Sequence, residues 1–383
     1  MAPASASCGP SARSRRPYLE FFAGSGLVAE GLRSFFRPVW ANDLSEKKAK
    51  TYIANHGARH FQLGSVEDVR GRDLPAAALA WASFPCQDLS LAGKQAGIQA
   101  ARSGLVWSWL RVLDEMPDKP EVLVAENVVG LVSSQGGLGY RLLHAALRAR
   151  GYVVGAVRLD AARWLPQSRP RVFVVAYRDG LPLPADLVAA GPTWAHDTAL
   201  IRAQRGLAAD GLDGWVWWAL PEPRARVAQL ANVLEPNASW SDPASPPAAM
   251  ALVAPAHEAR LRAAAQASST GEAVAAGFRR TRPGGQVVEL RFDGLAGCLR
   301  TPKGGSSRQL VVRAMQRGAG ALQCRWISPR EAARLMGAPD HYAIIGADSD
   351  GLAAMGDAVA VPVAKWLGRH LLATLARSAK SSA

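Results

Sequence analysis

The stretch Pro-Tyr-Leu-Glu-Phe-Phe-Ala-Gly-Ser-Gly at residues 17–26 decides the fold. Tyr18–Phe22 is a short apolar run typical of a buried strand, and Ala23-Gly24-Ser25-Gly26 forms a glycine-rich turn after it. Residues 27–35 then place apolar side chains at helical spacing. Such a turn lets a ligand approach the backbone at a helix N-terminus. Because the complete Gly-x-Gly-x-x-Gly spacing is absent, a plain connection explains the turn equally well on its own.

The same alternation of apolar runs and helix-period segments continues to residue 177. Because this rhythm is typical of a parallel sheet covered by helices, we expect a doubly wound, Rossmann-like α/β domain over 17–179. The predicted strands are 18–22, 38–41, 79–82, 122–125, 153–157 and 172–177, and the predicted helices between them include 27–35, 45–55, 105–115 and 140–150.

Prolines interrupt this rhythm after residue 180, and the chain is expected to divide there. A smaller, irregular module is predicted over 180–324, in which Trp215, Trp217 and Trp218 form a small core. Ser328 and Glu331 have the spacing of a capping box at the start of a helix in the segment 325–351. A C-terminal helix within 352–378 is expected to return to the first domain, and 1–16 is expected to be a flexible basic tail.

Composition narrows the class of protein. The 383 residues are 49% hydrophobic and 20% charged, which excludes a disordered or fibrous chain. No apolar run of about 18 residues or secretory signal occurs, so we expect a cytoplasmic protein with no membrane segment. The four cysteines are far apart and predict neither a disulfide framework nor a metal site. A net charge of +14 favours a polyanionic partner, with nucleic acid as the leading candidate.

Polar side chains follow several of the predicted strands. Asp43 ends the second strand, where a carboxylate can accept the ribose hydroxyls of a nucleoside. Cys86 follows the strand 79–82, and Glu126 follows the strand 122–125. If these strands are neighbours, a thiol and a carboxylate enter one crevice beside the glycine turn. A buried cysteine or a helix-capping glutamate would explain either residue singly, but not the pair.

Two arginines precede the last predicted strand, in Gln167-Ser168-Arg169-Pro170-Arg171. Residues two apart on an extended segment share a face, so Arg169 and Arg171 are both expected to point at the crevice. Without the neighbouring motifs, a solvated surface pair would explain them.

With these motifs in this order, the sequence resembles the bacterial or phage type of DNA (cytosine-5) methyltransferase. Residues 22–26 resemble the family's S-adenosylmethionine motif, 85–87 its catalytic-cysteine motif, 126–128 its Glu-Asn-Val motif and 167–171 its Gln-x-Arg-x-Arg motif. Residues 325–337 and 356–363 are similar to its two C-terminal motifs. The resemblance implies transfer of a methyl group from S-adenosylmethionine to carbon 5 of a cytosine flipped out of duplex DNA.

The resemblance also implies a role for each matching residue. Cys86 would attack carbon 6, Glu126 would contact ring nitrogen 3, and Arg171, with Arg169, would stabilise the adduct. The implied cofactor-binding residues are Phe22, Ala23, Gly24, Ser25, Gly26, Asp43, Leu44, Ser65, Pro85, Asp357 and Ala358.

Under the same resemblance the module 180–324 is a target recognition domain, because Arg and Gln read base edges while Gly and Ser admit phosphates. The implied DNA-binding residues are Gln87, Ser90, Gln167, Arg279, Arg280, Arg282, Lys303, Ser306, Ser307, Arg308 and Gln309. The expected partner is double-stranded DNA, bound by a monomer associated with the bacterial nucleoid. A cognate restriction endonuclease is a further possible partner.

Three positions depart from the family pattern. Asp357 stands where the family has Asn, Ser65 stands where it commonly has Asp, and Leu44 replaces an aromatic or apolar residue beside adenine. Two alternatives keep the fold: a transfer RNA cytosine-5 methyltransferase, and a catalytically silent DNA-binding regulator. A nicotinamide dehydrogenase is the fallback, but it leaves Cys86 and Glu126 without a joint role.

Overall fold

The structure is a computed structural model that describes residues 15–85, 104–236, 240, 252–301, 308–316 and 322–379. Its contacts divide the chain into two compact units. The first contains Met1–Leu159, Pro170–Glu222 and Val361–Ala383, and the second contains Asp160–Arg169 and Pro223–Ala360, each within the described ranges.

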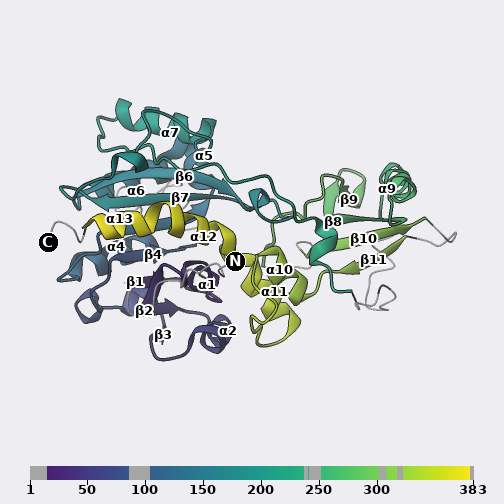
Figure 1. Ribbon diagram of the computed structural model, residues 1–383, viewed down its shortest axis with the longest axis horizontal. Coiled ribbons are helices and arrows are strands. Elements are labelled where there is room, and N and C mark those ends of the chain that lie inside the picture. The colour runs from purple at the N-terminus through teal and green to yellow at the C-terminus, as the bar shows by residue number, and fades with distance from the viewer. Residues whose placement is uncertain are drawn as a thin grey trace, which may run out of the picture. The chain divides into compact units, whose positions relative to one another are not determined.

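A seven-stranded sheet forms the centre of the first unit, in the order β3-β2-β1-β4-β5-β7-β6 (Figure 1). The strands β1 to β5 are parallel where they pair. The strand order reverses between β1 and β4, which is where ligands bind in open α/β sheets, outside the carboxyl ends of the strands. The predicted α/β fold class is therefore confirmed. The strands are β1 (Arg16–Phe21), β2 (Phe36–Asp43), β3 (Phe61–Leu63), β4 (Leu79–Ala82), β5 (Val122–Val128), β6 (Tyr152–Asp160) and β7 (Pro170–Arg178).

Helices bury the sheet because its central strands are apolar on both sides. One core joins alternate residues of the strands, such as Leu19, Ala80 and Leu123, to helices α4 (Leu105–Glu115), α5 (Gly130–Ser133), α6 (Leu138–Arg148) and α7 (Thr198–Ala209). Elsewhere α1 (Leu27–Leu32) packs on α12 (Val361–Leu367), and Figure 1 shows the two side by side. A Cβ at Gly31 would lie 2.7 Å from both the Ala364 Cβ and the Val361 carbonyl, so these helices need a glycine where they meet.

Two features of the sheet differ from the expectation. Strand β7 runs antiparallel to β5, with Glu126 opposite Phe173 and Val128 opposite Arg171. The short strand β3 was not predicted, because three residues carry too little alternation to recognise. Helix α2 (Glu46–His56) follows β2 and begins at the N-cap Ser45.

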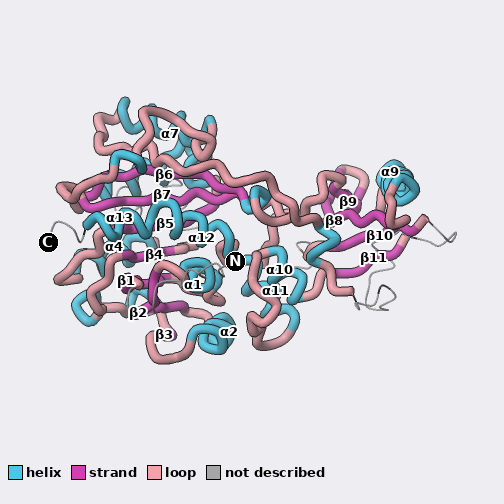
Figure 2. Tube along the Cα trace, viewed as in Figure 1, coloured by secondary structure: helices cyan, strands magenta, loops and turns pink. Residues whose placement is uncertain are grey.

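The second unit contains a four-stranded antiparallel sheet in the order β11-β10-β8-β9 (Figure 2). Its strands are β8 (Glu272–Arg282), β9 (Gly285–Arg291), β10 (Leu310–Met315) and β11 (Gln323–Trp326). Helix α9 (Pro255–Ala267) packs its Leu261 and Ala265 into the core of this sheet. The unit also contains α10 (Pro329–Leu335) and α11 (Asp348–Asp357). The predicted capping box of Ser328 and Glu331 at the start of α10 is confirmed.

The structure divides the chain differently from the predicted boundaries. Residues 180–222 lie in the first unit, whereas 160–169 and 325–360 lie in the second. The tryptophan cluster shows why: Trp218 is fully buried, and its indole N–H donates to the Val175 carbonyl of β7 at 3.2 Å. The prediction that these tryptophans form a core for the recognition module is therefore wrong. The segment 180–222, which begins the predicted module 180–324, is an extension of the first unit.

Candidate active site

The glycine turn after β1 has the backbone of a ligand-binding loop. Gly24 and Gly26 have φ angles of 56° and 85°, which glycine adopts without strain. Phe22 has a φ of 57°, an uncommon conformation for an aromatic residue that is often found at functional sites. The side chains of Ala23 and Ser25 are buried, so a ligand at this loop meets mainly its backbone.

Asp43 holds this loop in place. Its carboxylate accepts the Gly24 N–H at 2.7 Å through Oδ2 and the Ser45 N–H at 2.8 Å through Oδ1. Each oxygen has a second lone pair for a ligand hydroxyl. Leu44 is 73% exposed, and Leu63, opposite Asp43 on β3, is 51% exposed. Exposed apolar surface beside a carboxylate and a glycine loop fits the adenosine part of S-adenosylmethionine.

Two buried titratable groups lie near this loop, one on β1 before it and one on α2. Glu20 on β1 is 1% exposed and accepts the Tyr18 hydroxyl at 2.6 Å. Burial, with a smaller contribution from the nearby Asp43 carboxylate, raises the pKa of Glu20 from 4.5 to about 8, although its hydrogen bonds oppose the shift. On α2, burial lowers the pKa of His56 to about 4, and its Nε2 lies 2.9 Å from the Gly26 carbonyl. A Cβ at Gly26 would lie 2.6 Å from the His56 ring, so the loop and α2 interlock.

Sequence reasoning overlooked both groups. The signal for Glu20 was a lone carboxylate within the apolar run 18–22. No local signal marked His56, because its contact with Gly26 spans 30 residues.

Glu126 and Arg171 meet at the end of β5. The Arg171 Nε lies 3.2 Å from Glu126 Oε1, with side chains 15% and 8% exposed. Next to them, the Asn127 side chain donates to the Phe84 carbonyl at 3.1 Å and accepts the Val128 N–H at 2.9 Å. Asn127 therefore fixes the end of β5 to the segment just before Cys86.

The nucleophile motif is only partly described. Pro85 is exposed at the end of the described segment, and Cys86, Gln87 and Ser90 lie outside the described residues.

Gln167 and Arg169 do not take the places predicted for them, which were a contact with DNA and a position facing the crevice. Gln167 is fully buried, donates to the Leu335 carbonyl at 2.7 Å and accepts the Leu299 N–H at 3.1 Å. Its expected contact with DNA is therefore wrong, because both polar ends of its amide are used inside the second unit.

Arg169 is also buried, at 1% exposure. Its guanidinium donates to the carbonyls of Leu299, Gly356 and Ala358 at 2.9, 2.8 and 2.6 Å. It thus joins three segments of the second unit. The expectation that it points at a crevice is wrong, because these carbonyls hold its guanidinium inside the unit.

The departures from the family pattern have local partners. Asp357 Oδ1 accepts the Thr301 hydroxyl at 2.5 Å, and Ser65 caps a short helical turn by accepting the Glu67 N–H at 3.2 Å. The extra charge of Asp357 therefore has a hydrogen-bond donor.

The remaining predicted DNA-binding residues fall into four groups. Arg280 and Arg282 are half-exposed and share the Glu289 carboxylate. Gln309 is buried with its amide against Gly297, so its predicted base contact is wrong. Arg279 and Arg308 each lie over the Trp326 ring, at 5.1 and 5.4 Å. Lys303, Ser306 and Ser307 lie outside the described residues.

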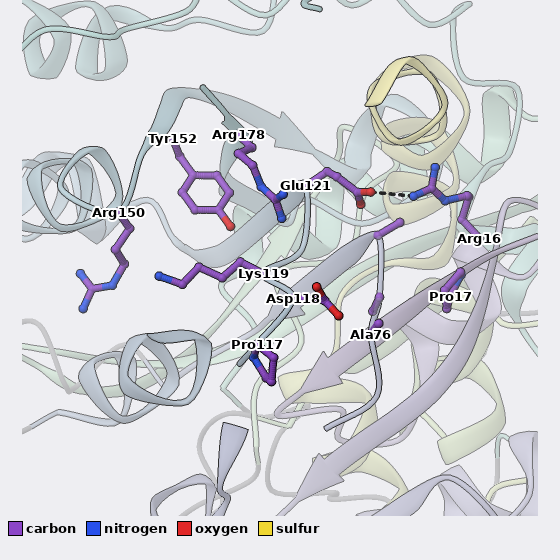
Figure 3. A pocket seen from close by; sticks show the side chains of 12 residues that line it. Arg16, Pro17, Ala76, Pro117, Asp118, Lys119, Glu121, Arg150, Tyr152 and Arg178 are labelled. Carbon is purple, nitrogen blue, oxygen red and sulfur yellow. Dashed lines mark hydrogen bonds and ion pairs between the residues drawn. The ribbon is translucent and has the colours of Figure 1, made fainter. Parts of the chain in front are cut away.

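A hollow of about 590 Å³ lies in the first unit at the amino-terminal ends of β1, β4, β5 and β6 (Figure 3). Its charges are largely compensated: Arg16 pairs with Glu121 at 2.8 Å, and Arg150 pairs with Asp114 at 2.6 Å. Because the glycine loop and Glu126 lie at the other ends of these strands, this hollow is distinct from the candidate active site.

The fold and site define a Rossmann-like domain with a glycine loop after its first strand and a buried carboxylate–arginine pair at the end of β5. The model of the C-5 cytosine-specific DNA methylase family matches residues 17–199 and 298–373. The chain therefore belongs to this family of DNA cytosine-5 methyltransferases.

Individual relatives agree with this membership. The chain is 30% identical to type II methyltransferase M.BsuFI of Bacillus subtilis over 166 residues, which cover 43% of this chain and 40% of the relative. It is 25% identical to type II methyltransferase M.NlaX of Neisseria lactamica over 362 residues, 93% of this chain and 96% of the relative. The matches to M.BsuFI and to M.Bsp6I span only about half of those proteins or less.

Solved structures share the fold. The S. pombe Dnmt2 methyltransferase is 18% identical with a TM-score of 0.57, and the match covers 92% of this chain and 97% of that chain. A putative DNA modification methyltransferase encoded in an E. coli prophage is 16% identical with a TM-score of 0.52, over 92% and 97% of the two chains. Within the described residues, no helix is long and apolar enough to cross a membrane.

Proposed function

We propose that this protein transfers a methyl group from S-adenosylmethionine to carbon 5 of cytosine in double-stranded DNA. The observation that carries the proposal is the Glu126–Arg171 pair, whose polar atoms lie 3.2 Å apart at the carboxyl end of β5. An acid and a cation so placed suit a cytosine ring, which needs a partner at nitrogen 3 and a donor at its carbonyl oxygen.

The reaction requires a nucleophile, because carbon 5 of cytosine reacts poorly by itself. The Cys86 thiolate adds to carbon 6, which gives carbon 5 the character of an enamine. Glu126 holds the proton at ring nitrogen 3, and Arg171 donates to the carbonyl oxygen where negative charge develops. Once carbon 5 has formed a bond to the methyl group that S-adenosylmethionine would supply, loss of the carbon 5 proton and departure of the Cys86 sulfur restore the ring.

The glycine loop, Asp43 and Leu44 would hold S-adenosylmethionine, which supplies the methyl group when bound. Asp43 suits the ribose hydroxyls, and Leu44 suits one face of the adenine ring. His56 acts on the loop rather than on the reacting atoms, as a positioning residue.

The substrate is proposed to be a cytosine flipped out of the duplex, because a base within the stack hides carbon 6 from a protein thiol. The second unit is the proposed target recognition domain, and its β8–β9 hairpin lies in the stretch between the two matched parts of the family model. The type II names of the relatives favour a place in restriction-modification, with a cognate restriction endonuclease as partner. We also propose that the protein acts as a cytoplasmic monomer on nucleoid DNA.

Transfer of a radioactive methyl group from S-adenosylmethionine tests the proposal, with unmethylated duplex DNA and transfer RNA in parallel and Cys86→Ala as the control. We expect label in DNA that disappears with Cys86→Ala. Label in RNA alone would instead establish the transfer RNA enzyme. DNA binding without any transfer would establish a silent regulator.

A further inference from the structure

The fully buried side chain of Trp81 on β4 makes two contacts that lead to different parts of the candidate active site. Its indole N–H donates to the Ser83 hydroxyl at 3.0 Å, in the segment that follows β4. Its ring meets the Phe173 ring of β7 edge to face, with the ring centres 5.9 Å apart and an angle of 61° between the planes. The indole therefore joins the end of β4 to β7, although β5 lies between these strands.

Strand register places this ring contact beside the proposed acid. On parallel β5, Val124 pairs with Trp81, and the next residue on the same face is Glu126. Glu126 in turn pairs with Phe173 on antiparallel β7. Trp81 and Phe173 thus lie on the face of the sheet that carries Glu126, one strand away on each side. Their contact fixes β4 and β7 together next to the Glu126–Arg171 pair.

The segment that leads from β4 to Cys86 is also held through its backbone. The Ser83 N–H donates to a carbonyl of β1 at 3.4 Å, and the Phe84 carbonyl accepts the Asn127 amide of β5 at 3.1 Å. The Trp81 indole adds a hold on a side chain, so Ser83 is fixed through both its backbone and its hydroxyl.

The Trp81–Ser83 hydrogen bond constrains the chain because a buried indole N–H without an acceptor is costly. Ser83 must therefore stay where its hydroxyl meets the indole. Attack by a thiolate depends on its position relative to the reacting carbon, and a displacement of about 1 Å can slow such a reaction roughly 100-fold. A contact that fixes the chain three residues before Cys86 is therefore expected to act on the rate of attack.

We propose that Trp81 is a positioning residue for methyl transfer, which fixes the chain before the Cys86 nucleophile to the strand opposite Glu126. This inference rests on the proposed function. Because Trp81 is fully buried, it acts through Ser83 at one end and through Phe173 at the other.

The test measures the rate constant of a single turnover with saturating duplex DNA and radioactive S-adenosylmethionine. The variants are Ser83→Ala, which removes the hydroxyl, Trp81→Phe, which keeps an aromatic ring without the N–H, and the double variant. Each single variant should lower the rate constant about tenfold, while the dissociation constants for DNA and cofactor change less than about twofold. The double variant should be no slower than the slower single variant, because both substitutions remove the same hydrogen bond. Ser83→Thr, which keeps the hydroxyl, should retain at least about half of the wild-type rate constant.

Trp218→Phe is the matched control. Trp218 is also fully buried, and its indole N–H donates to the Val175 carbonyl at 3.2 Å. This variant should lower the melting temperature and leave the rate constant unchanged. A purely structural loss lowers the fraction of protein that turns over, which is seen in the amplitude of the single turnover, and not the rate constant of the folded fraction.

Three outcomes would overturn the inference. The first is a wild-type rate constant in Ser83→Ala. The second is a double variant slowed by the product of the two single effects, which would mean that the two side chains act independently. The third is equal slowing by Trp218→Phe, which would indicate a general loss of packing. If Trp81→Phe does not fold, the comparison of Ser83→Ala with Ser83→Thr still decides, because the first must be slow and the second fast.

Failure of the proposed function would look different. Wild-type protein would then transfer no methyl group to any nucleic acid in this assay, which would overturn both proposals. Transfer to RNA alone would overturn DNA as the substrate, and the same rate constants measured on RNA would then decide the role of Trp81.

Discussion

The buried Glu20 carboxyl makes the stability of the first unit depend on pH. Its pKa is raised to about 8 in the folded protein, against an ordinary value of 4.5. Between these values the folded state keeps a proton that the unfolded state has released. Glu20 therefore makes its full contribution to the unfolding free energy below about pH 4.5, and this contribution is lost as the pH rises through about 8.

Replacing the carboxyl with an amide removes this dependence. Each pH unit between the two pKa values corresponds to about 1.4 kcal/mol. From about pH 6 to about pH 9, wild-type protein should therefore lose roughly 3 kcal/mol of unfolding free energy relative to Glu20→Gln. Gln keeps the shape of the side chain and an oxygen that can accept the Tyr18 hydroxyl.

Denaturant unfolding followed by far-ultraviolet circular dichroism at both pH values gives the difference. Glu46→Gln is the control, because Glu46 is an exposed carboxylate at the start of α2. Its difference from wild type should not change over this range. A Glu20→Gln difference that stays constant within about 0.5 kcal/mol would refute the reasoning, because it would mean that Glu20 is already ionised in the folded state.

Three further substitutions probe other parts of the account. Gly31→Ala should lower the unfolding free energy by about 1–3 kcal/mol, because its methyl group would force α1 away from α12; a melting temperature equal to wild type would contradict this packing. Asn127→Ala should cost about 1–3 kcal/mol by leaving the buried Phe84 carbonyl without its donor, and should slow methyl transfer in single-turnover assays more than it weakens cofactor binding. As pH falls from about 6.5 to about 4, the unfolded state protonates His56 while the folded state keeps it neutral, so wild type should lose roughly 3 kcal/mol of unfolding free energy. His56→Gln should not show this loss. Acid-unfolding curves that run parallel for the two proteins would contradict the prediction.

Local patterns predicted the elements of the first unit well. The bounds of β4 and α4 agree with the predicted ones, since each is a strongly periodic segment with clear ends. The capping box at Ser328 was also readable, because it depends on side chains only three residues apart. The motifs around Asp43, Glu126 and Arg171 could be found for the same reason.

Contacts between distant segments could not be predicted in this way. Arg169 and Gln167 look like exposed polar residues in the sequence, but their partners lie more than 120 residues away. No neighbouring residue in the sequence indicates that backbone carbonyls and amides of distant segments will surround their side chains.

The same limit explains the wrong domain boundary. Trp218 donates a hydrogen bond to Val175 of β7, 43 residues earlier in the chain. The prolines between them therefore suggested a domain boundary, although this segment belongs to the first unit. The second sheet was not predicted, because β8 pairs with β10 across the intervening β9 and arginines interrupt the apolar pattern of its strands.

The most direct test of the central claim is the chemical identity of the product. Duplex DNA incubated with the protein and S-adenosylmethionine would be digested to nucleosides and analysed by mass spectrometry against standards. The account predicts 5-methyldeoxycytidine, formed by wild type and absent with Cys86→Ala. Methylation of the exocyclic amine of cytosine or of adenine, or 5-methyldeoxycytidine that persists with Cys86→Ala, would contradict it.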